Sequence, residues 1–316
     1  MKNRTKLFLS LITFIICCFF ISSCKTTEND YKPHTLLWSV ERNSKTLYLL
    51  GSVHIGSEDI YPLDKTIMKA FNQADVLGVE INPKNVNFLD MLSLFFDPLR
   101  DNSKLLSKDT YNKIKELFAS FNLNDEIIKK LKPVGIAILS EVSKFSKIAK
   151  TLKGIDSFDK SMASSLSTPG IDQYFLNLAD STGKEIYEIE SVKRQLRVFE
   201  ALEDVIEDYI EETLSIDNTE KETMEIQTIM NAWKNGDIET LKKILDVDYT
   251  SNQKLNKRIK EELIIKRNKE MADNIEKILA NEDKNYFIIV GAGHLVSEKN
   301  IIELLEKTGK YKIKRY

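Results

Sequence analysis

The chain has 316 residues, with 46 lysines and arginines against 48 aspartates and glutamates, and its formal net charge is −2. Hydrophobic residues make up 42% and charged residues 30%, which is typical of a globular protein and excludes disordered, collagen-like and coiled-coil classes. The balanced charge lacks the basic surplus of nucleic-acid-binding proteins, so no nucleic-acid partner is expected. A chain of this length buries about 75% of its unfolded surface and needs no disulfides to fold.

The N-terminus has the features of a targeting segment. Three basic residues among the first six precede a nearly unbroken apolar run, Leu7–Phe20, which is short for a membrane span of about 20 residues. The following Ser22-Ser23-Cys24 resembles the lipobox of bacterial lipoproteins. We therefore predict that residues 1–23 are a lipoprotein signal peptide and that Cys24 is lipidated, for example with palmitate. The alternative is an ordinary signal peptide with a chance cysteine.

A lipidated Cys24 predicts an extracytoplasmic protein of the bacterial cell envelope that is anchored to a membrane. Residues 24–34 are polar and are predicted to form a tether, which leaves 35–316 as the folded domain. All three cysteines lie at or before position 24. The domain therefore has no thiol for a nucleophile, a zinc ligand or a disulfide.

The two ends of the domain show the same order of predicted elements. The N-terminal end has a strand at Thr46–Leu50, the motif Gly51-Ser-Val-His54, helical spacing over Leu63–Phe71 and a strand at Val76–Ile81. The C-terminal end has a strand at Tyr286–Val290, the motif Gly291-Ala-Gly-His294, helical spacing over Asn300–Lys307 and a strand at Tyr311–Tyr316. We interpret this order as a degenerate internal repeat.

A further apolar strand, Glu185–Ile189, is predicted between two mostly helical regions, 105–151 and 192–280. Nearly continuous apolar strands joined through helices indicate a sheet that is buried on both faces. We therefore predict one α/β domain with a mixed central sheet. Two strand–GxxH–helix–strand units would build the sheet, and a large helical insertion would interrupt it.

The paired Gly-x-x-His motifs are the first candidate site. With 11 glycines and three histidines in the chain, chance predicts roughly 0.1 such motifs. Each motif follows a predicted strand, so His54 and His294 are expected at the carboxyl edge of the sheet, where α/β proteins build their sites. Neutral imidazole is a common ligand of divalent metals. The alternative is a pair of structural histidines in tight turns.

Two acidic residues are candidates for the same site. Glu80 lies in an apolar strand, where a carboxylate is costly unless it is paired or binds a cation. Glu190 ends a comparable strand, and either residue could bind a metal or act as a general base. Glu188 competes with Glu190 because it lies two residues away on the same strand face. A buried ion pair is the alternative for both positions.

Arg267 is the fourth candidate because it falls in an apolar helical stripe. The stripe consists of Ile259, Leu263, Met271, Ile275 and Ile278. A buried arginine needs an acidic partner or an anionic ligand. Arg267 could therefore stabilise an oxyanion or hold a substrate carboxylate. Alternatively, it forms a structural salt bridge with Glu80 or Glu190.

Taken in order, these motifs resemble the TraB/PrgY/GumN family, which includes the animal Tiki proteins. The matching pieces are Leu37-Trp38, Leu47–His54, Val76–Glu80, Gly170-Ile-Asp172, Ala179, Gly183-Lys184, Ile189-Glu190, Gln195, Ala232-Trp233, Gly236-Asp237, Arg267-Asn268, Met271-Ala272 and Val290–Leu295. They cover nearly all of residues 35–316. One departure is Ser52, where the family more often has threonine.

The resemblance implies an α/β fold similar to that of erythromycin esterases and the haem-binding ChaN lipoproteins. Tiki members are membrane-tethered, metal-dependent proteases that trim a secreted signalling protein. The family's paired motifs map onto His54 and His294, its acidic residue maps onto Glu80, and its Arg-Asn motif maps onto Arg267 and Asn268. We therefore expect a lipid-anchored metallopeptidase that acts on peptides or secreted proteins.

In this reading, His54, His294, Glu80 and Glu190 bind a divalent metal. Mn²⁺ or Co²⁺ is favoured over Zn²⁺ because the set holds imidazole and carboxylate but no thiolate. Glu80 could instead be the general base, and Arg267 would stabilise developing negative charge. One alternative is a non-catalytic lipoprotein that binds haem or a peptide. Another is an erythromycin-esterase-like hydrolase that uses histidine as a base without a metal.

Overall fold

The computed structural model describes residues 35–43, 45–54, 56, 60–85, 88–140, 143, 169–195, 203, 219–246, 253–281 and 283–316. The predicted signal peptide, lipidation site and tether lie outside these residues, as do parts of the two predicted helical regions. Within the described part of the chain, no helix combines the length and the apolar character needed to cross a membrane.

The domain is built on a mixed six-stranded sheet with the strand order β4-β3-β5-β2-β1-β6. The strands are β1 (Leu37–Arg42), β2 (Lys45–Ser52), β3 (Val76–Val79), β4 (Glu185–Glu188), β5 (Tyr286–Gly291) and β6 (Lys312–Arg315). Strands β4, β3, β5 and β2 pair in parallel, whereas β1 is antiparallel to both β2 and β6. The mixed α/β class is therefore confirmed.

Strand β1 is absent from the sequence prediction. Its first four residues are all buried, so the sequence lacks the alternation that marks a half-buried strand. At the two edges of the sheet the prediction of complete burial is wrong. Strands β4 and β6 alternate between exposed and half-buried residues, because an edge strand has a neighbour on one side only. The inner strand β5 is buried from Tyr286 to Val290, as predicted.

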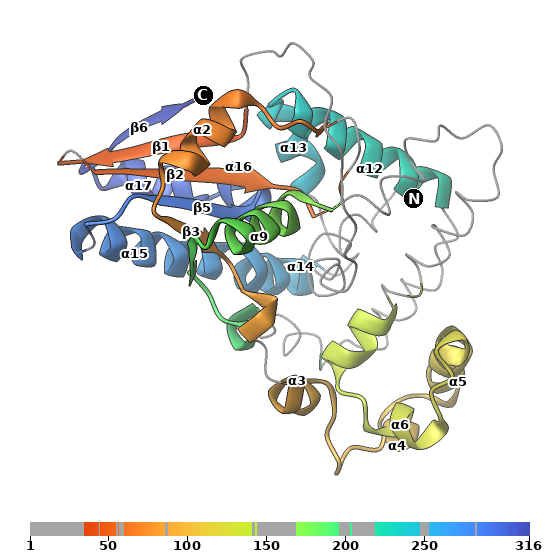
Figure 1. Ribbon diagram of the computed structural model, residues 1–316. Coiled ribbons are helices and arrows are strands. Elements are labelled where there is room, and N and C mark those ends of the chain that lie inside the picture. The colour runs from red at the N-terminus through yellow and green to blue at the C-terminus, as the bar shows by residue number, and fades with distance from the viewer. Residues whose placement is uncertain are drawn as a thin grey trace.

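Helices cover both faces of the sheet (Figure 1). Apart from the helices within 88–140, the described helices are α2 (Lys65–Gln73), α9 (Ile171–Thr182), α12 (Thr219–Lys234), α13 (Ile238–Leu245), α14 (Gln253–Lys260), α15 (Lys266–Asn281), α16 (Gly293–Val296) and α17 (Ile301–Lys307). A π-helical turn, η6 (Glu261–Ile265), joins α14 to α15 without a break. A short 3₁₀ turn, η3 (Pro83–Asn85), follows β3.

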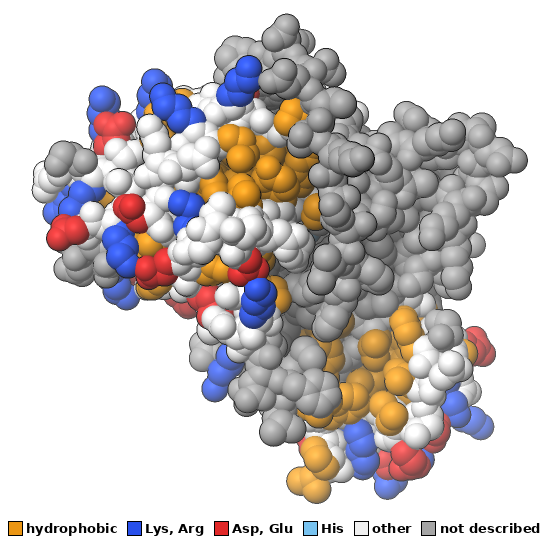
Figure 2. Space-filling model, viewed as in Figure 1, with side chains coloured by type: hydrophobic (Ala, Val, Ile, Leu, Met, Phe, Trp, Pro, Cys, Tyr) orange, Lys and Arg blue, Asp and Glu red, His pale blue; other side chains and the backbone are white. Residues whose placement is uncertain are grey.

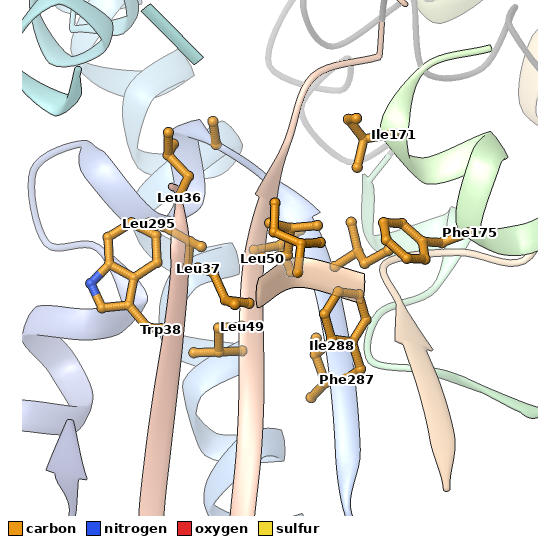
Figure 3. Packing of buried hydrophobic residues seen from close by; sticks show 14 of the residues in the cluster. Leu36, Leu37, Trp38, Leu49, Leu50, Ile171, Phe175, Phe287, Ile288 and Leu295 are labelled. Atoms are coloured by element: carbon orange, nitrogen blue, oxygen red, sulfur yellow. The ribbon is translucent and has the colours of Figure 1, made fainter. Parts of the chain in front are cut away.

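The core joins these helices to the sheet. Phe71 of α2, Phe175 of α9 and Phe287 of β5 pack with ring centroids 5.0–5.6 Å apart. Figure 3 shows Phe175 and Phe287 close together, and Leu49 and Leu50 of the neighbouring strand lie in the same cluster. Burial of this continuous cluster ties α2 and α9 to the centre of the sheet, where the two Gly-x-x-His motifs begin.

The predicted order of elements at the two ends is observed. Strand β2 leads through the first motif and α2 to β3, and β5 leads through the second motif, α16 and α17 to β6. The two units occupy different places in the sheet, because β5 separates β2 from β3, whereas β2 and β1 separate β5 from β6. The internal repeat itself stays a prediction.

A second apolar cluster lies in the helical part of the chain. Its helices are α3 (Phe88–Phe95), α4 (Asn102–Leu105), α5 (Lys108–Phe118) and α6 (Asp125–Lys130), with the turn η4 (Ala119–Phe121) and helical residues 133–140. The cluster also contains Ile259 and Leu263, so it packs against α14 and η6. Apolar side chains are visible at the surface of this part (Figure 2), where Leu99 is 93% exposed.

A side chain at Gly78 is expected to destabilise the sheet. A Cβ atom there would lie 2.6 Å from Ile288 Cγ1 on the paired strand β5. Gly78→Ala should therefore lower the free energy of unfolding by about 1–3 kcal/mol through overpacking. Urea unfolding would measure this loss, which should shrink in an Ile288→Ala background. Equal losses in both backgrounds would contradict the close packing of β3 on β5.

Candidate functional site

The two Gly-x-x-His motifs meet at the carboxyl ends of the inner strands β2 and β5. Strands β2 and β5 are parallel neighbours, and Ser52 is paired with Gly291, so both motifs leave the sheet together. A Cβ atom at Gly291 would lie 3.5 Å from Glu80 Oε1, 3.8 Å from His54 Nε2 and 3.8 Å from His294 Cδ2. Three of the predicted site residues therefore surround one point beside Gly291.

His54 is held through its other ring nitrogen. Its Nδ1 lies 2.9 Å from Asp172 Oδ2, and Ser52 Oγ donates to Asp172 Oδ1 at 2.9 Å. A carboxylate can only accept, so Nδ1 carries a proton, and in the neutral ring Nε2 is then the nitrogen with the lone pair. Burial lowers the pKa of His54, but the Asp172 and Glu80 carboxylates raise it by more, and the pKa lies above its usual value.

His294 has a neutral partner in place of the carboxylate. Its Nδ1 lies 2.6 Å from Asn268 Oδ1, and Asn268 Nδ2 donates to the Lys299 carbonyl at 3.0 Å, which orients the amide. Burial and the charge of Arg267 lower the pKa of His294 well below its usual value. The ring is therefore neutral near pH 7, with Nε2 as its acceptor, 3.9 Å from Glu80 Oε1.

Glu80 directly follows β3 and is only 5% exposed. Its Oε2 accepts from Gln195 Nε2 at 2.8 Å and from Arg267 Nη2 at 2.6 Å. Its Oε1 accepts from the Gly291 backbone N–H at 2.7 Å and lies 3.9 Å from His294 Nε2. The hydrogen bonds from Gln195 and Arg267 to Oε2 thus fix the carboxylate, and Oε1 faces the point beside Gly291.

Arg267 bridges the two buried carboxylates. Its Nε and Nη2 each donate to Glu190 at 2.7 Å, Nη2 also donates to Glu80, and Nη1 donates to the Leu263 carbonyl at 3.2 Å. The side chains of Arg267 and Glu190 are 1% and 3% exposed. The ion-pair alternative for Arg267 is therefore realised with both predicted partners, and its guanidinium faces carboxylates rather than the histidines.

Glu188 and Glu190 have different hydrogen-bond partners in the structure. Glu188, the last residue of β4, accepts from the Asn82 backbone N–H at 2.6 Å and from Asn85 Nδ2 at 2.9 Å, next to η3. Glu190 lies beyond the strand and binds Arg267 through both of its oxygens. Glu190 therefore belongs to the buried cluster, where it reaches the arginine rather than the imidazoles.

Sequence reasoning assigned no role to several residues that support this site. Asp172 and Ser52 hold His54, and Gln195 holds Glu80. Trp233 Nε1 donates to the Gly51 carbonyl at 2.7 Å and steadies the start of the first motif. An aspartate in the first turn of a helix is common because it stabilises the helix. Apart from the family resemblance, the sequence therefore did not indicate that Asp172 belongs to the site.

The segment before α9 packs directly on the first motif. The Ile171 backbone N–H donates to the Val53 carbonyl at 3.1 Å. A Cβ atom at Gly170 would lie 2.2 Å from the His54 carbonyl oxygen, so only glycine allows this approach. The contact brings Asp172 to His54 from a segment more than 110 residues further along the chain.

The donor chemistry beside Gly291 suits a divalent cation. Two imidazole Nε2 atoms and one carboxylate oxygen are ligands typical of Mn²⁺, Co²⁺ and Zn²⁺ sites. A Cβ atom at Gly291 would be in ordinary contact with all three side chains, so the glycine lets them approach one point. Among the described residues, no three His, Cys, Asp or Glu side chains are already grouped at the spacing of a metal site. The residues fit a metal by type and orientation.

Comparison with curated proteins finds distant relatives. The chain is 24% identical over 187 residues to "Metalloprotease TIKI homolog" of Amphimedon queenslandica, which covers 51% of this chain and 35% of the relative. It is 20% identical over 323 residues to "Metalloprotease TIKI1" of Xenopus tropicalis, covering 91% and 63%. It is 21% identical over 264 residues to "Uncharacterized protein YbaP" of Escherichia coli K12, covering 83% and 88%.

The chain thus spans about a third of one metalloprotease relative and less than two thirds of the other. No solved structure matches it significantly. The family model for TraB/PrgY/gumN matches residues 36–315, which is nearly the whole described domain. The chain therefore belongs to the TraB/PrgY/gumN family.

Proposed function

We propose that this protein is a metal-dependent hydrolase in which His54, His294 and Glu80 hold the metal. The observation that carries the proposal is the pair of ring contacts. Asp172 and Asn268 each bind an Nδ1, so Nε2 is the acceptor nitrogen of each neutral ring, and His54 Nε2 and Glu80 Oε1 lie within 3.8 Å of the same Cβ position at Gly291. Metal-bound histidines are held in this way, with the second ring nitrogen donating to a carboxylate or an amide.

A bound divalent metal would acidify a water molecule and polarise a carbonyl group. The chain's own residues prepare for this chemistry. Asn268 keeps His294 in the form that can bind a cation, and Arg267 offsets the charge of Glu80. Because both Glu190 oxygens bind Arg267, we assign Glu190 the role of holding the arginine. Glu80 serves as a ligand through Oε1, and Arg267 acts on the reaction through Glu80.

The finer proposal is a peptidase of the cell envelope. The names of two relatives, both metalloproteases, support peptide or protein substrates. The signal-like N-terminus and Cys24 support a lipid anchor outside the cytoplasm. Mn²⁺ or Co²⁺ remains the proposed metal because the donors are nitrogen and oxygen only.

A second candidate is a hydrolase that works without a metal. Ser52, Asp172 and His54 form a hydrogen-bonded chain that resembles the carboxylate–histidine pair of general-base catalysis. His54 Nε2 would then take the proton from water. Glu80 and His294 would orient the substrate in this case.

The experiment measures metal content and peptide cleavage of the purified protein with Mn²⁺, Co²⁺ and Zn²⁺. We expect stoichiometric metal and metal-stimulated cleavage of a peptide library. Both should be lost in His54→Ala and His294→Ala. Cleavage that survives chelation would favour the metal-free candidate. A folded protein without metal or cleavage would contradict both candidates, and a Soret band on haem addition would then support haem binding.

Gly291→Ala provides a sharper test of the same site. The new methyl group would lie at ordinary contact distances of 3.5–3.8 Å from Glu80, His54 and His294, so the fold should survive. The methyl group would occupy the position proposed for the metal. Metal binding should therefore be lost without a change in the unfolding midpoint. Glu298→Ala, at a side chain that is 65% exposed, is the control and should change neither quantity.

A further inference from the structure

The two histidines of the site are held by chemically different partners. His54 Nδ1 contacts the Asp172 carboxylate, whereas His294 Nδ1 contacts the neutral Asn268 amide. We infer that Asp172 is a positioning residue that fixes the His54 ring with Nδ1 protonated and Nε2 beside Gly291. Its effect on metal binding rests on the proposed function, but its effect on the ring does not.

The hydrogen bonds of Asp172 leave its carboxylate little freedom to turn. One oxygen accepts from His54 Nδ1 and the other accepts from Ser52 Oγ, both at 2.9 Å. Ser52 is the last residue of β2, so its hydroxyl is carried by the sheet itself. The Asp172 carboxylate therefore links the His54 ring to Ser52, and so fixes the ring relative to strand β2.

The backbone around Asp172 is fixed to the same motif. The Ile171 backbone N–H donates to the Val53 carbonyl, and Gly170 packs against the backbone of His54. Asp172 follows in the first turn of α9. The start of α9 and the first motif therefore form one unit, in which a rotation of the imidazole would break its contact with the carboxylate.

The partner of His294 shows what the charge of Asp172 adds. Asn268 is also fixed, since its Nδ2 donates to the Lys299 carbonyl. An amide oxygen orients a ring but brings no charge, whereas a carboxylate also strengthens the ring as a ligand. The two imidazoles therefore differ, and His54 is expected to be the stronger metal ligand. Asp172→Asn would give His54 the kind of partner that His294 already has.

The first test measures the ring ¹⁵N signals by NMR in metal-free protein with ¹⁵N-labelled histidine, at a pH above the pKa of both rings. Signals would be assigned by comparison with His54→Ala and His294→Ala. In the wild type, both rings should show protonated Nδ1. In Asp172→Asn the Nδ1–H signal of His54 should move toward that of His294, and in Asp172→Ala the His54 ring should become a tautomer mixture. The His294 signals should not change.

An unchanged His54 spectrum in Asp172→Asn would overturn the inference, and this variant preserves the size of the side chain should the alanine variant fail to fold. A structural role alone would lower the unfolding midpoint and leave the ring spectrum as it was. The second measurement is Co²⁺ affinity, which should fall by about 10- to 100-fold in Asp172→Asn. If the wild type binds no Co²⁺, the proposed metal function fails, while the ring spectrum still decides the role of Asp172.

Discussion

Replacing Arg267 by methionine is expected to lower the free energy of unfolding by about 3–5 kcal/mol. The guanidinium is the shared partner of Glu80 and Glu190, and all three side chains are at most 5% exposed. Its removal would leave two buried carboxylates facing each other without a positive charge. Urea unfolding of the wild type and the variant measures the loss, and the proposed hydrolytic activity should fall with it because Glu80 loses its support.

The Glu190→Gln background identifies the source of this loss. Removing one of the two carboxylates should make Arg267→Met less costly, because fewer buried charges are then left uncompensated. Lys310→Met is the control, since it breaks an exposed ion pair with Glu276 and should cause no measurable change. An Arg267→Met variant as stable as the wild type would rule out the buried ion-pair cluster.

Gly170→Ala is expected to disable the site by moving the first motif. The backbone of Gly170 has φ −65° and ψ 170°, which alanine adopts without strain, so the effect is steric. The new Cβ would lie 2.2 Å from the His54 carbonyl oxygen, and the two backbones would have to separate. A displacement of about 1 Å at His54 should reduce turnover by about 100-fold. Overpacking should also cost about 1–3 kcal/mol of stability.

Gly309→Ala separates the clash from a general effect of alanine. Gly309 has φ +65° and no neighbour within 4 Å of a Cβ atom, so it should lose about 1 kcal/mol through backbone strain. Gly309 lies between α17 and β6, outside both motifs, so turnover should stay normal. Wild-type turnover in Gly170→Ala would show that His54 does not depend on the packing of α9.

The sequence predicted the parts of the site that local patterns encode. The apolar run Tyr286–Val290 indicated a buried strand, and the turn after it indicated that His294 leaves the sheet at a strand end; the structure has both features. The helical spacing around Arg267 indicated a buried arginine, which is 1% exposed. These features follow from the periods of strands and helices, which are properties of short segments.

Other features depend on which strands become neighbours. The two histidines meet because β2 and β5 pair, and a sequence pattern does not determine strand order. The same packing brings α9 to β2, which places Asp172 at His54, although the segment's own sequence shows only an ordinary helix start. Strand β1 escaped prediction because its buried residues do not alternate.

The choice between Glu188 and Glu190 shows the division most clearly. Both lie near the end of one strand and share a face by sequence spacing. Glu188 binds the turn after β3, whereas Glu190, past the end of β4, binds Arg267 of α15. The sequence by itself determined that a buried arginine needs a carboxylate, because desolvating a charge is costly everywhere in a protein. Only the tertiary structure decided which carboxylates meet it, because that depends on where α15 packs against the ends of the strands.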